Sequence, residues 1–227
     1  MKLFSVAVES LKFATDDLAI IQLKKPASYH YRAGQFTQLV LPQVKSRSPL
    51  DNWCWLSFAS APNEPLLEFA IRLGPSVFKQ TIRHLTVGET VQVGRPHGVL
   101  QLPKVEPIFL FAGGVGIAPI RSLLVNSNQI KNLTLFYSVT NPDEALYCDE
   151  LSCLPHLTLV ATLTGDTQRT GFRHGRINHA MLTAANFTAT GQCLIVGSPS
   201  FVDGMMSLIK SYGTPDSQIG VERFTGL

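Results

Sequence analysis

The stretch Phe109-Leu110-Phe111-Ala112-Gly113-Gly114-Val115-Gly116-Ile117-Ala118-Pro119-Ile120-Arg121-Ser122 joins an apolar run to a second segment through a glycine turn. The apolar run 108–112 is short and follows Pro107, which is typical of a buried strand in a parallel sheet. Residues 119–126 predict a helix after the turn. Glycines let a backbone come close to a ligand, and the N–H groups that open a helix can bind a phosphate. The stretch therefore predicts either a nucleotide-binding loop or a plain structural turn.

Length and composition allow two domains without a membrane span. The 227 residues suffice for two compact domains, each with its own core. Although 45% of the residues are hydrophobic, no apolar run approaches the ~20 residues that cross a membrane. The stretch 1–9 becomes charged too early for a secretory signal and alternates like a strand. We therefore expect a cytoplasmic protein.

Charge and spacing exclude several classes of function. A net charge of +3 without a long run of Lys and Arg argues against nucleic-acid binding. The cysteines at positions 54, 148, 153 and 193 form no Cys-x-x-Cys pair, so we expect free thiols and no iron–sulfur cluster. The six histidines lack metal-ligand spacing and no hydrolase motif is present, so we expect no metal site.

The two halves of the chain differ in their hydrophobic pattern. Up to Pro103, short apolar or alternating runs separated by turns predict an antiparallel barrel or sandwich, with strands at 4–8, 18–23, 36–41, 66–73 and 90–93 and one helix at 77–85. From Pro107, strands at 109–112, 133–138, 157–163 and 194–196 alternate with helices at 119–126, 143–151 and 201–212. This second pattern predicts a doubly wound parallel sheet.

Seven short motifs follow one another along nearly the whole chain. They are Ala33-Gly34-Gln35-Phe36, Ser57-Phe58-Ala59-Ser60-Ala61-Pro62, Ser76-Val77-Phe78-Lys79, Val87-Gly88-Glu89, Pro96-His97-Gly98, Gly114-Val115-Gly116-Ile117-Ala118-Pro119 and Glu222-Arg223-Phe224-Thr225-Gly226. In this order they resemble the ferredoxin–NADP reductase superfamily, which includes flavodoxin reductases and flavin reductases. The resemblance implies an antiparallel β-barrel domain that binds FAD at residues 1–103, followed by an α/β domain with a parallel sheet that binds NADH or NADPH at 107–227.

The resemblance also implies an oxidoreductase that passes electrons from NAD(P)H through FAD to an external acceptor. That acceptor is a ferredoxin, a flavodoxin, a partner subunit, free flavin or ferric ion, and the sequence does not select among them or indicate an oligomeric state.

The flavin strand of the family reads Arg-x-Tyr-Ser, and its match here is Cys54-Trp55-Leu56-Ser57. The resemblance implies that Ser57 hydrogen-bonds the reducible edge of the flavin. The arginine that neutralises the flavin pyrophosphate is replaced by Cys54, and Arg72, Lys79 or Arg47 is a candidate to compensate. The implied cofactor contacts of this half are Trp55, Leu56, Ser57, Phe58, Ala59, Arg72, Leu73, Gly74, Ser76 and Lys79.

In the second half, the segment Gly197-Ser198-Pro199 resembles the family's Cys-Gly-Pro loop, with Val196 in place of the cysteine. Glu222 and Phe224 match the terminal acid and aromatic residues that close over the flavin, whereas Leu227 is not aromatic. The implied cofactor contacts of this half are Gly113, Gly114, Val115, Gly116, Ile117, Pro119, Ser138, Thr140, Gly197, Ser198, Pro199 and Phe224. The implied catalytic residues are Ser57 and Glu222.

Two alternatives stay open. Thr140 stands where NADP-dependent members place an arginine, which favours NADH, but Arg169 or Arg173 is an alternative ligand for a ribose phosphate. Because both the arginine and the tyrosine of the flavin strand are missing, the chain is alternatively a partner protein that keeps the fold and binds flavin weakly or only a nucleotide.

Overall fold

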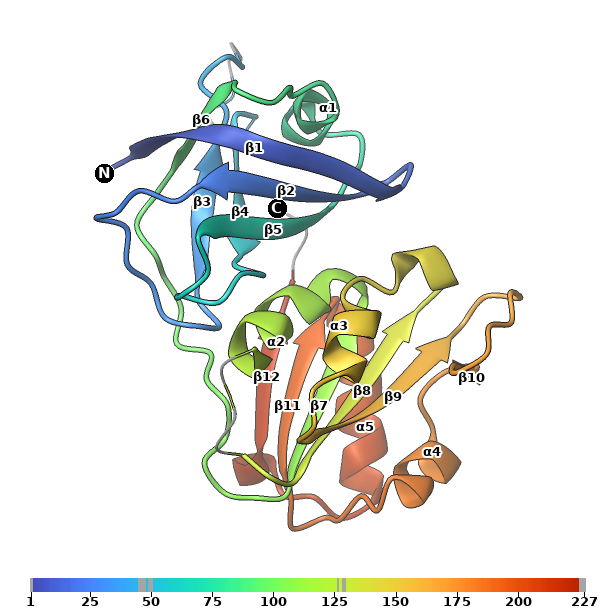
Figure 1. Cartoon of the computed structure of the whole chain (residues 1–227). Coiled ribbons are helices and arrows are strands. Elements are labelled where there is room, and N and C mark those ends of the chain that lie inside the picture. Colours follow the sequence, from blue (N-terminus) through green and yellow to red (C-terminus); the bar gives the residue numbers. More distant parts are fainter. Residues whose placement is uncertain (1, 45–47, 49–50, 126, 128–129, 225–227) are drawn as a thin grey trace. The chain divides into compact units, whose positions relative to one another are not determined.

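The computed structural model describes residues 2–44, 48, 51–125, 127 and 130–224 (Figure 1). The chain forms two compact units. The first contains residues 1–101 together with 121–123, and the second contains 102–120 and 124–226. No helix among the described residues combines the length and the apolar character that crossing a membrane requires.

The first unit is an antiparallel sheet with one helix. Its elements are β1 (Phe4–Thr15), β2 (Leu18–Lys24), β3 (Phe36–Val40), β4 (Trp53–Ser57), β5 (Leu66–Arg72), α1 (Val77–Arg83) and β6 (Thr90–Val93), and the strand order is β4-β3-β6-β1-β2-β5. The two outermost strands, β4 and β5, also contact each other, which is how a sheet closes into a barrel. The antiparallel architecture is confirmed, and a barrel describes it better than a sandwich.

The core of this unit follows from strand alternation. On β4, Cys54 and Leu56 face the interior opposite Leu39 and Thr37 of β3, because directly paired residues share one face of the sheet. Trp55 and Ser57 point to the other face. The helix α1 begins at Ser76, whose hydroxyl accepts a hydrogen bond from the Lys79 amide at 3.4 Å.

The second unit is a parallel sheet with helices on both sides. Its elements are β7 (Ile108–Gly113), α2 (Ile117–Leu124), β8 (Leu133–Val139), α3 (Cys148–Ser152), β9 (Leu157–Leu163), β10 (Arg173–His174), α4 (His179–Ala184), β11 (Gln192–Gly197), α5 (Pro199–Ser211) and β12 (Ile219–Arg223). The strand order is β10-β9-β8-β7-β11-β12, and every pair is parallel.

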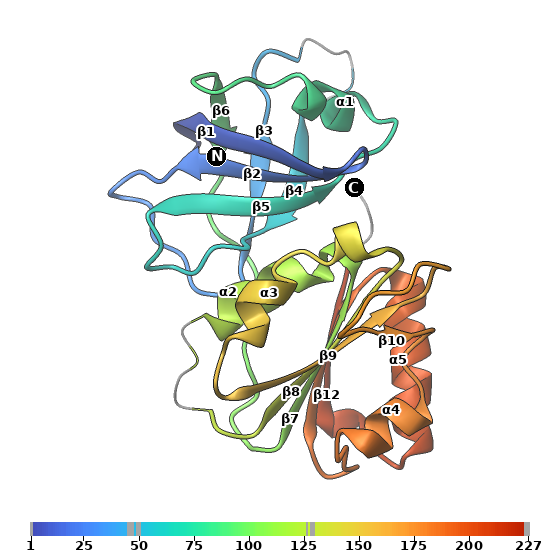
Figure 2. The same ribbon diagram turned by 45° about the vertical axis from the view of Figure 1, so that its right-hand side comes forward.

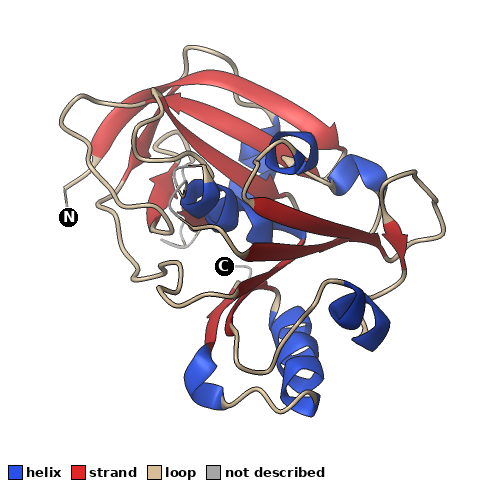
Figure 3. Ribbon diagram, turned by 60° about the horizontal axis from the view of Figure 1, so that its bottom comes forward, coloured by secondary structure: helices blue, strands red, loops and turns tan. Residues whose placement is uncertain are grey.

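The helices of this unit cover both faces of the sheet. Figure 2 shows α2 and α3 on one side and α4 and α5 on the other. The helix α5 contacts β11 and β12 (Figure 3). This doubly wound arrangement confirms the parallel sheet predicted from the alternation of strands and helices.

Two local predictions were wrong or incomplete. The helix predicted at 143–151 is interrupted, because Tyr147 has a φ of 62° and separates a 3₁₀ turn at Pro142–Glu144 from α3. Residues with positive φ cannot continue a right-handed helix. The sequence patterns also did not predict α4, β10 or β12, and β1 runs seven residues past its predicted end at Val8.

Candidate functional site

The parallel sheet places two predicted loops at its topological switch point. The chain leaves β7 for β8 on one side, whereas β11 lies against the other side of β7. Ligands of such sheets bind outside the carboxyl ends of the strands at the switch point. The carboxyl ends of β7 and β11 carry Gly113 and Gly197, so the glycine turn and the 197–199 loop are neighbours there.

The three glycines of the turn have different structural reasons. A Cβ on Gly116 would lie 2.4 Å from the Val196 carbonyl oxygen, and a Cβ on Gly113 would lie 2.6 Å from the Phe201 ring. These two glycines are therefore required by packing. Gly114 has a φ of +52° and nothing within 4 Å of a Cβ, so its surroundings are open. Of the three, Gly114 best fits a backbone that approaches a ligand.

The loop after β11 is a capped helix start. Ser198 precedes α5, and its hydroxyl accepts a hydrogen bond from the Phe201 amide at 3.3 Å. Pro199 occupies the first turn, where the missing N–H is no loss. The predicted role of Ser198 and Pro199 beside a nicotinamide stays a prediction.

The end of β8 carries the residues predicted to select the nucleotide. Ser138 pairs with Gly113 across β7 and β8 and is half-buried, while Thr140 is exposed. Arg169 stacks its guanidinium on the Phe172 ring at 5.5 Å, and Arg173 lies on β10 opposite Thr162. Thr140, Arg169 and Arg173 therefore all stay candidates for the residue that selects the nucleotide. Val115, Ile117 and Pro119 lie in the glycine turn and the first turn of α2.

The last strand, β12, places the carboxyl group of Glu222 beside β11. Glu222 pairs with Val196, and the Phe224 amide donates to the Gly197 carbonyl at 2.8 Å. Burial raises the pKa of Glu222 to about 7. A carboxyl that titrates near neutral pH can hold or release a proton under working conditions. The prediction for Leu227 lies outside the described residues.

In the first unit, Ser57 lies at the end of β4, on the face opposite the one that carries Cys54 and Leu56. Ser57 is half-buried. Trp55, on the same face, is 37% exposed and lies edge-on to Phe36 at 5.3 Å and to His97 at 5.2 Å. Leu56 faces the interior, so Trp55 and Leu56 do not line one surface.

Three predicted cofactor contacts have buried side chains that pack in the first unit. Phe58 is fully buried and stacks on Tyr31 with ring centroids 4.0 Å apart. Ala59 is fully buried, and its amide already donates to the Glu68 carbonyl at 2.7 Å. Leu73 is 5% exposed and belongs to the barrel core. Because these side chains are buried, a cofactor could be contacted only through their backbone, and their predicted role stays a prediction.

The candidate cations near β4 are not equivalent. The Arg72 guanidinium binds Asp17 through contacts of 2.9 and 3.0 Å, which commits it to an ion pair. The Lys79 side chain lies beside Gly74, since a Cβ on Gly74 would be 3.7 Å from Lys79 Cδ. Burial raises the pKa of the Cys54 thiol to about 11, and the nearby positive charge of Lys79 acts in the opposite direction. Arg47 lies outside the described residues.

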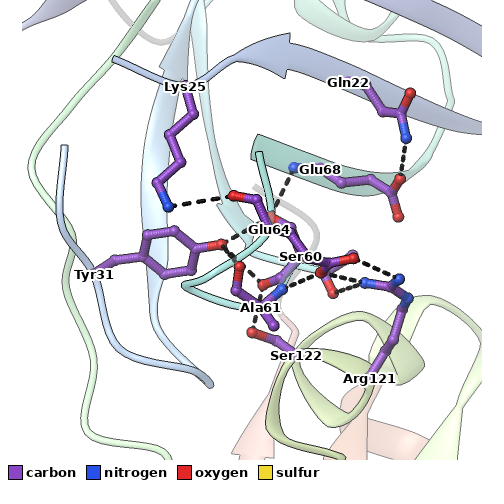
Figure 4. Close-up of polar contacts among 10 residues, drawn as sticks. Gln22, Lys25, Tyr31, Ser60, Ala61, Glu64, Glu68, Arg121 and Ser122 are labelled. Carbon is purple, nitrogen blue, oxygen red and sulfur yellow. Dashed lines mark hydrogen bonds and ion pairs between the residues drawn. The ribbon is translucent and has the colours of Figure 1, made fainter. Parts of the chain in front are cut away.

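Sequence reasoning missed a polar network that contains Arg121 and Glu64 (Figure 4). A signal was present in the sequence, because Arg121 is the one charged residue in the helix Ile117–Leu124. An arginine at such a position is almost always paired when it is buried. No group of three potential metal ligands occurs among the described residues.

Comparison with known proteins finds similar sequences and similar folds among oxidoreductases. The model for the "Oxidoreductase NAD-binding domain" matches residues 110–207. The reductase component of propane 2-monooxygenase from Rhodococcus jostii is 25% identical over 93% of this chain and 60% of its own length. The reductase component 1 of terephthalate 1,2-dioxygenase from Comamonas is 26% identical over 93% of this chain and 65% of its own length.

Among solved structures, a ferredoxin NADP+ reductase from Neisseria gonorrhoeae with bound FAD and NADP has a TM-score of 0.84 at 21% identity, and the match covers 100% of both chains. The whole chain has the fold of ferredoxin–NADP reductases, and residues 110–207 match the family of oxidoreductase NAD-binding domains. It spans 60% to 66% of the length of the monooxygenase reductase components that it matches.

Proposed function

We propose that the protein is an NAD(P)H-dependent flavoprotein oxidoreductase that passes electrons through FAD to an external acceptor. In this proposal residues 1–103 bind FAD and residues 107–227 bind the nicotinamide nucleotide. The observation that carries it is the likeness to oxygenase reductase components across 93% of the chain, through both units, rather than in the nucleotide-binding unit alone.

The residues present fit both cofactors. Gly114 offers an open backbone at the switch point, which suits a pyrophosphate beneath the start of α2. Ser57 supplies a hydroxyl at the end of β4, and Lys79 supplies a cation near the position that Cys54 leaves uncharged. When bound, the flavin supplies the capacity to accept a hydride and to release electrons.

The protein itself contributes binding and orientation. Ser57 would donate to or accept from the redox edge of the flavin, and the turn around Gly114 would hold the nucleotide. Glu222 would hold a proton near neutral pH, because burial disfavours its charged form. No other acid or base in the candidate site is required.

The preferred nucleotide in this proposal is NADH. Thr140 offers one hydroxyl at the end of β8, which does not balance a phosphate dianion. Thr140→Arg should therefore move the preference toward NADPH by about 1–3 kcal/mol, the scale of one charge-assisted hydrogen bond. The ratio of kcat/KM for the two nucleotides measures this. A wild-type protein that prefers NADPH tenfold would contradict the assignment and point to Arg169 or Arg173.

The acceptor in this proposal is a ferredoxin, a flavodoxin, a partner subunit, free flavin or ferric ion. The named activities of the relatives favour a partner protein, since several are reductase components of oxygenases. The second candidate function is a nucleotide-binding partner protein of a larger complex. It is favoured by Cys54 and Leu56, which remove the charge and the ring cover of the family's flavin strand.

Flavin binding and reduction separate the two functions. The purified protein is titrated with FAD, and NADH is then added without oxygen while flavin absorbance is followed. Bleaching of bound flavin by NADH supports the oxidoreductase. A protein that binds nucleotide but cannot be loaded with FAD would support the partner function instead.

A further inference from the structure

The segment 58–62, which follows Ser57 directly, is held through four successive backbone carbonyl groups. Figure 4 shows the contacts at Ser60 and Ala61. The carbonyl of Ala59 accepts from Arg121 at 2.8 Å, and that of Ser60 accepts from Ser122 at 2.6 Å. The Ala61 carbonyl lies 2.9 Å from the Tyr31 hydroxyl, and the Pro62 carbonyl accepts from Lys25.

Arg121 is the centre of this arrangement. Its guanidinium donates to both carboxylate oxygens of Glu64, at 2.9 and 3.0 Å, in addition to the Ala59 carbonyl. The Arg121 residue is 7% exposed, and residues 121–123 belong to the first unit. A bidentate arginine–carboxylate pair fixes direction as well as distance, because both groups are planar.

Glu64 binds the same segment at the Ala61 amide. Its carboxylate accepts a hydrogen bond from the Ala61 amide as well as from Arg121. Burial alone would raise the pKa of Glu64, but the hydrogen bonds from Arg121 and Ala61 hold it below its ordinary value. The carboxylate therefore stays charged at neutral pH, and the pair stays intact.

Other hydrogen bonds at Phe58, Ala59 and Ser60 hold the same segment. Phe58 donates to the Gln35 carbonyl at 3.0 Å, and Ala59 donates to the Glu68 carbonyl at 2.7 Å. The Ser60 hydroxyl accepts from the Glu68 amide at 2.9 Å. With these contacts the backbone that follows Ser57 has little freedom to shift.

We infer that Arg121 and Glu64 are positioning residues that hold the end of β4 so that the Ser57 hydroxyl is presented in a fixed place. The inference rests on the proposed function, in which Ser57 contacts the flavin. Arg121 and Glu64 touch neither flavin nor nucleotide in this scheme and act through the Ala59 and Ala61 backbone. Small displacements of a positioned group lower reaction rates steeply. Loss of the Arg121–Glu64 pair should therefore lower the rate of hydride transfer to the flavin.

A double-mutant cycle tests the inference in the FAD-saturated protein. Arg121→Gln should slow flavin reduction by NADH about tenfold in the wild-type background. In the Ser57→Ala background the same change should slow it less than about twofold, because the positioned group is already absent. Hydrogen exchange should show faster exchange of the 58–61 amides in Arg121→Gln than in the wild-type protein.

Matched variants separate positioning from general stability. Arg83→Gln removes an arginine from the end of α1, where it donates to the Asp16 carbonyl, and should change neither flavin reduction nor exchange of the 58–61 amides. Glu64→Gln keeps the side-chain shape and should reproduce the dependence on Ser57 with a smaller effect. It also serves as the test if Arg121→Gln does not fold.

Equal slowing by Arg121→Gln in both backgrounds, or unchanged amide exchange, would overturn the inference and leave the proposed function standing. A wild-type protein whose bound flavin is not reduced by NADH or NADPH would overturn the proposed function and the inference together.

Discussion

Position 54 carries a buried thiol where the family places a cation, so the charge that balances a flavin phosphate must come from another residue. Arg72 is engaged by Asp17, with a closest contact of 2.9 Å. Lys79 lies beside Gly74 and close enough to Cys54 for its charge to affect the pKa of that thiol. Because its charge reaches position 54, Lys79 is the candidate that lies best for this role.

Lys79→Gln should therefore weaken binding of FAD and FMN by about 10–100-fold, the effect of losing one charge-assisted contact to a phosphate. Riboflavin, which carries no phosphate, should bind with unchanged affinity. Fluorescence titration with the three flavins measures the difference. The matched control is Lys12→Gln on β1, an exposed lysine that makes the same change in net charge. Equal weakening for riboflavin would show that Lys79 does not contact the phosphate.

Glu222 makes stability depend on pH in a direction that can be worked out. Its ordinary pKa is 4.5 and its folded pKa is about 7, because burial disfavours the charged carboxylate. Below pH 4.5 the group is protonated in both states and costs nothing. As pH rises from 4.5 to about 7, unfolding releases a proton and the folded state loses stability.

Glu222→Gln should remove this loss, since the amide is neutral at every pH. The variant should match the wild-type protein near pH 4 and exceed its free energy of unfolding by up to about 3 kcal/mol near pH 8.5. Urea unfolding at both pH values provides the measurement. A difference that does not grow with pH would mean that Glu222 is not buried as a carboxylate.

At the scale of elements, the turn between β7 and α2 contains one glycine that packing requires and one that is open to a ligand. Gly116 faces the Val196 carbonyl oxygen, 2.4 Å from the place of a Cβ, whereas nothing lies within 4 Å of a Cβ on Gly114. A methyl group at position 116 must displace backbone of β11. At position 114 it meets only the cost of a positive φ.

Gly116→Ala should therefore destabilise the protein by more than Gly114→Ala, which should cost about 1–2 kcal/mol for its left-handed backbone. The order should reverse for relative loss of function, with Gly114→Ala raising the KM for NADH although the fold is kept. Thermal unfolding and steady-state kinetics on both variants test this. A Gly114→Ala protein with unchanged KM would remove Gly114 from the nucleotide site.

Elements with strong periodicity could be predicted from the sequence, and those that depend on single residues could not. The apolar run of β7 is unbroken, so its burial could be predicted from the sequence. The break at Tyr147 could not, because a tyrosine in the left-handed region is set by its surroundings rather than by propensity. The short helix α4 is capped by Asn178. This cap was not recognised in the sequence, because the residues between β9 and α4 are mostly polar.

At the scale of the whole molecule, the change of pattern near Pro103 predicted two halves, but the units are not continuous in sequence. Residues 121–123 fall in the predicted second half and belong structurally to the first unit. No local pattern shows that Arg121 pairs with Glu64, 57 positions earlier. Long-range ion pairs are decided by tertiary packing, which is why the pairing of Arg121 with Glu64 could not be predicted from motifs.

This shared arrangement predicts that residues 1–103 are incomplete as a separate domain. Without Arg121 and Ser122, the Glu64 carboxylate and the Ala59 and Ser60 carbonyls lose partners that the whole chain provides. Losing the partners of partly buried polar groups costs about 1–3 kcal/mol. Both tryptophans, Trp53 and Trp55, lie in β4, so indole fluorescence reports the first unit alone in either protein.

Urea unfolding followed by tryptophan fluorescence should give the 1–103 fragment a free energy of unfolding about 1–3 kcal/mol lower than that of the first unit in the full chain. Full-length Arg121→Gln should show most of the same loss, which separates the effect of the missing arginine from that of the missing second unit. Glu64→Gln should cost less in the fragment than in the full chain, because it removes a carboxylate that the fragment leaves without its arginine. A fragment as stable as the full chain would show that residues 1–103 fold without help from α2.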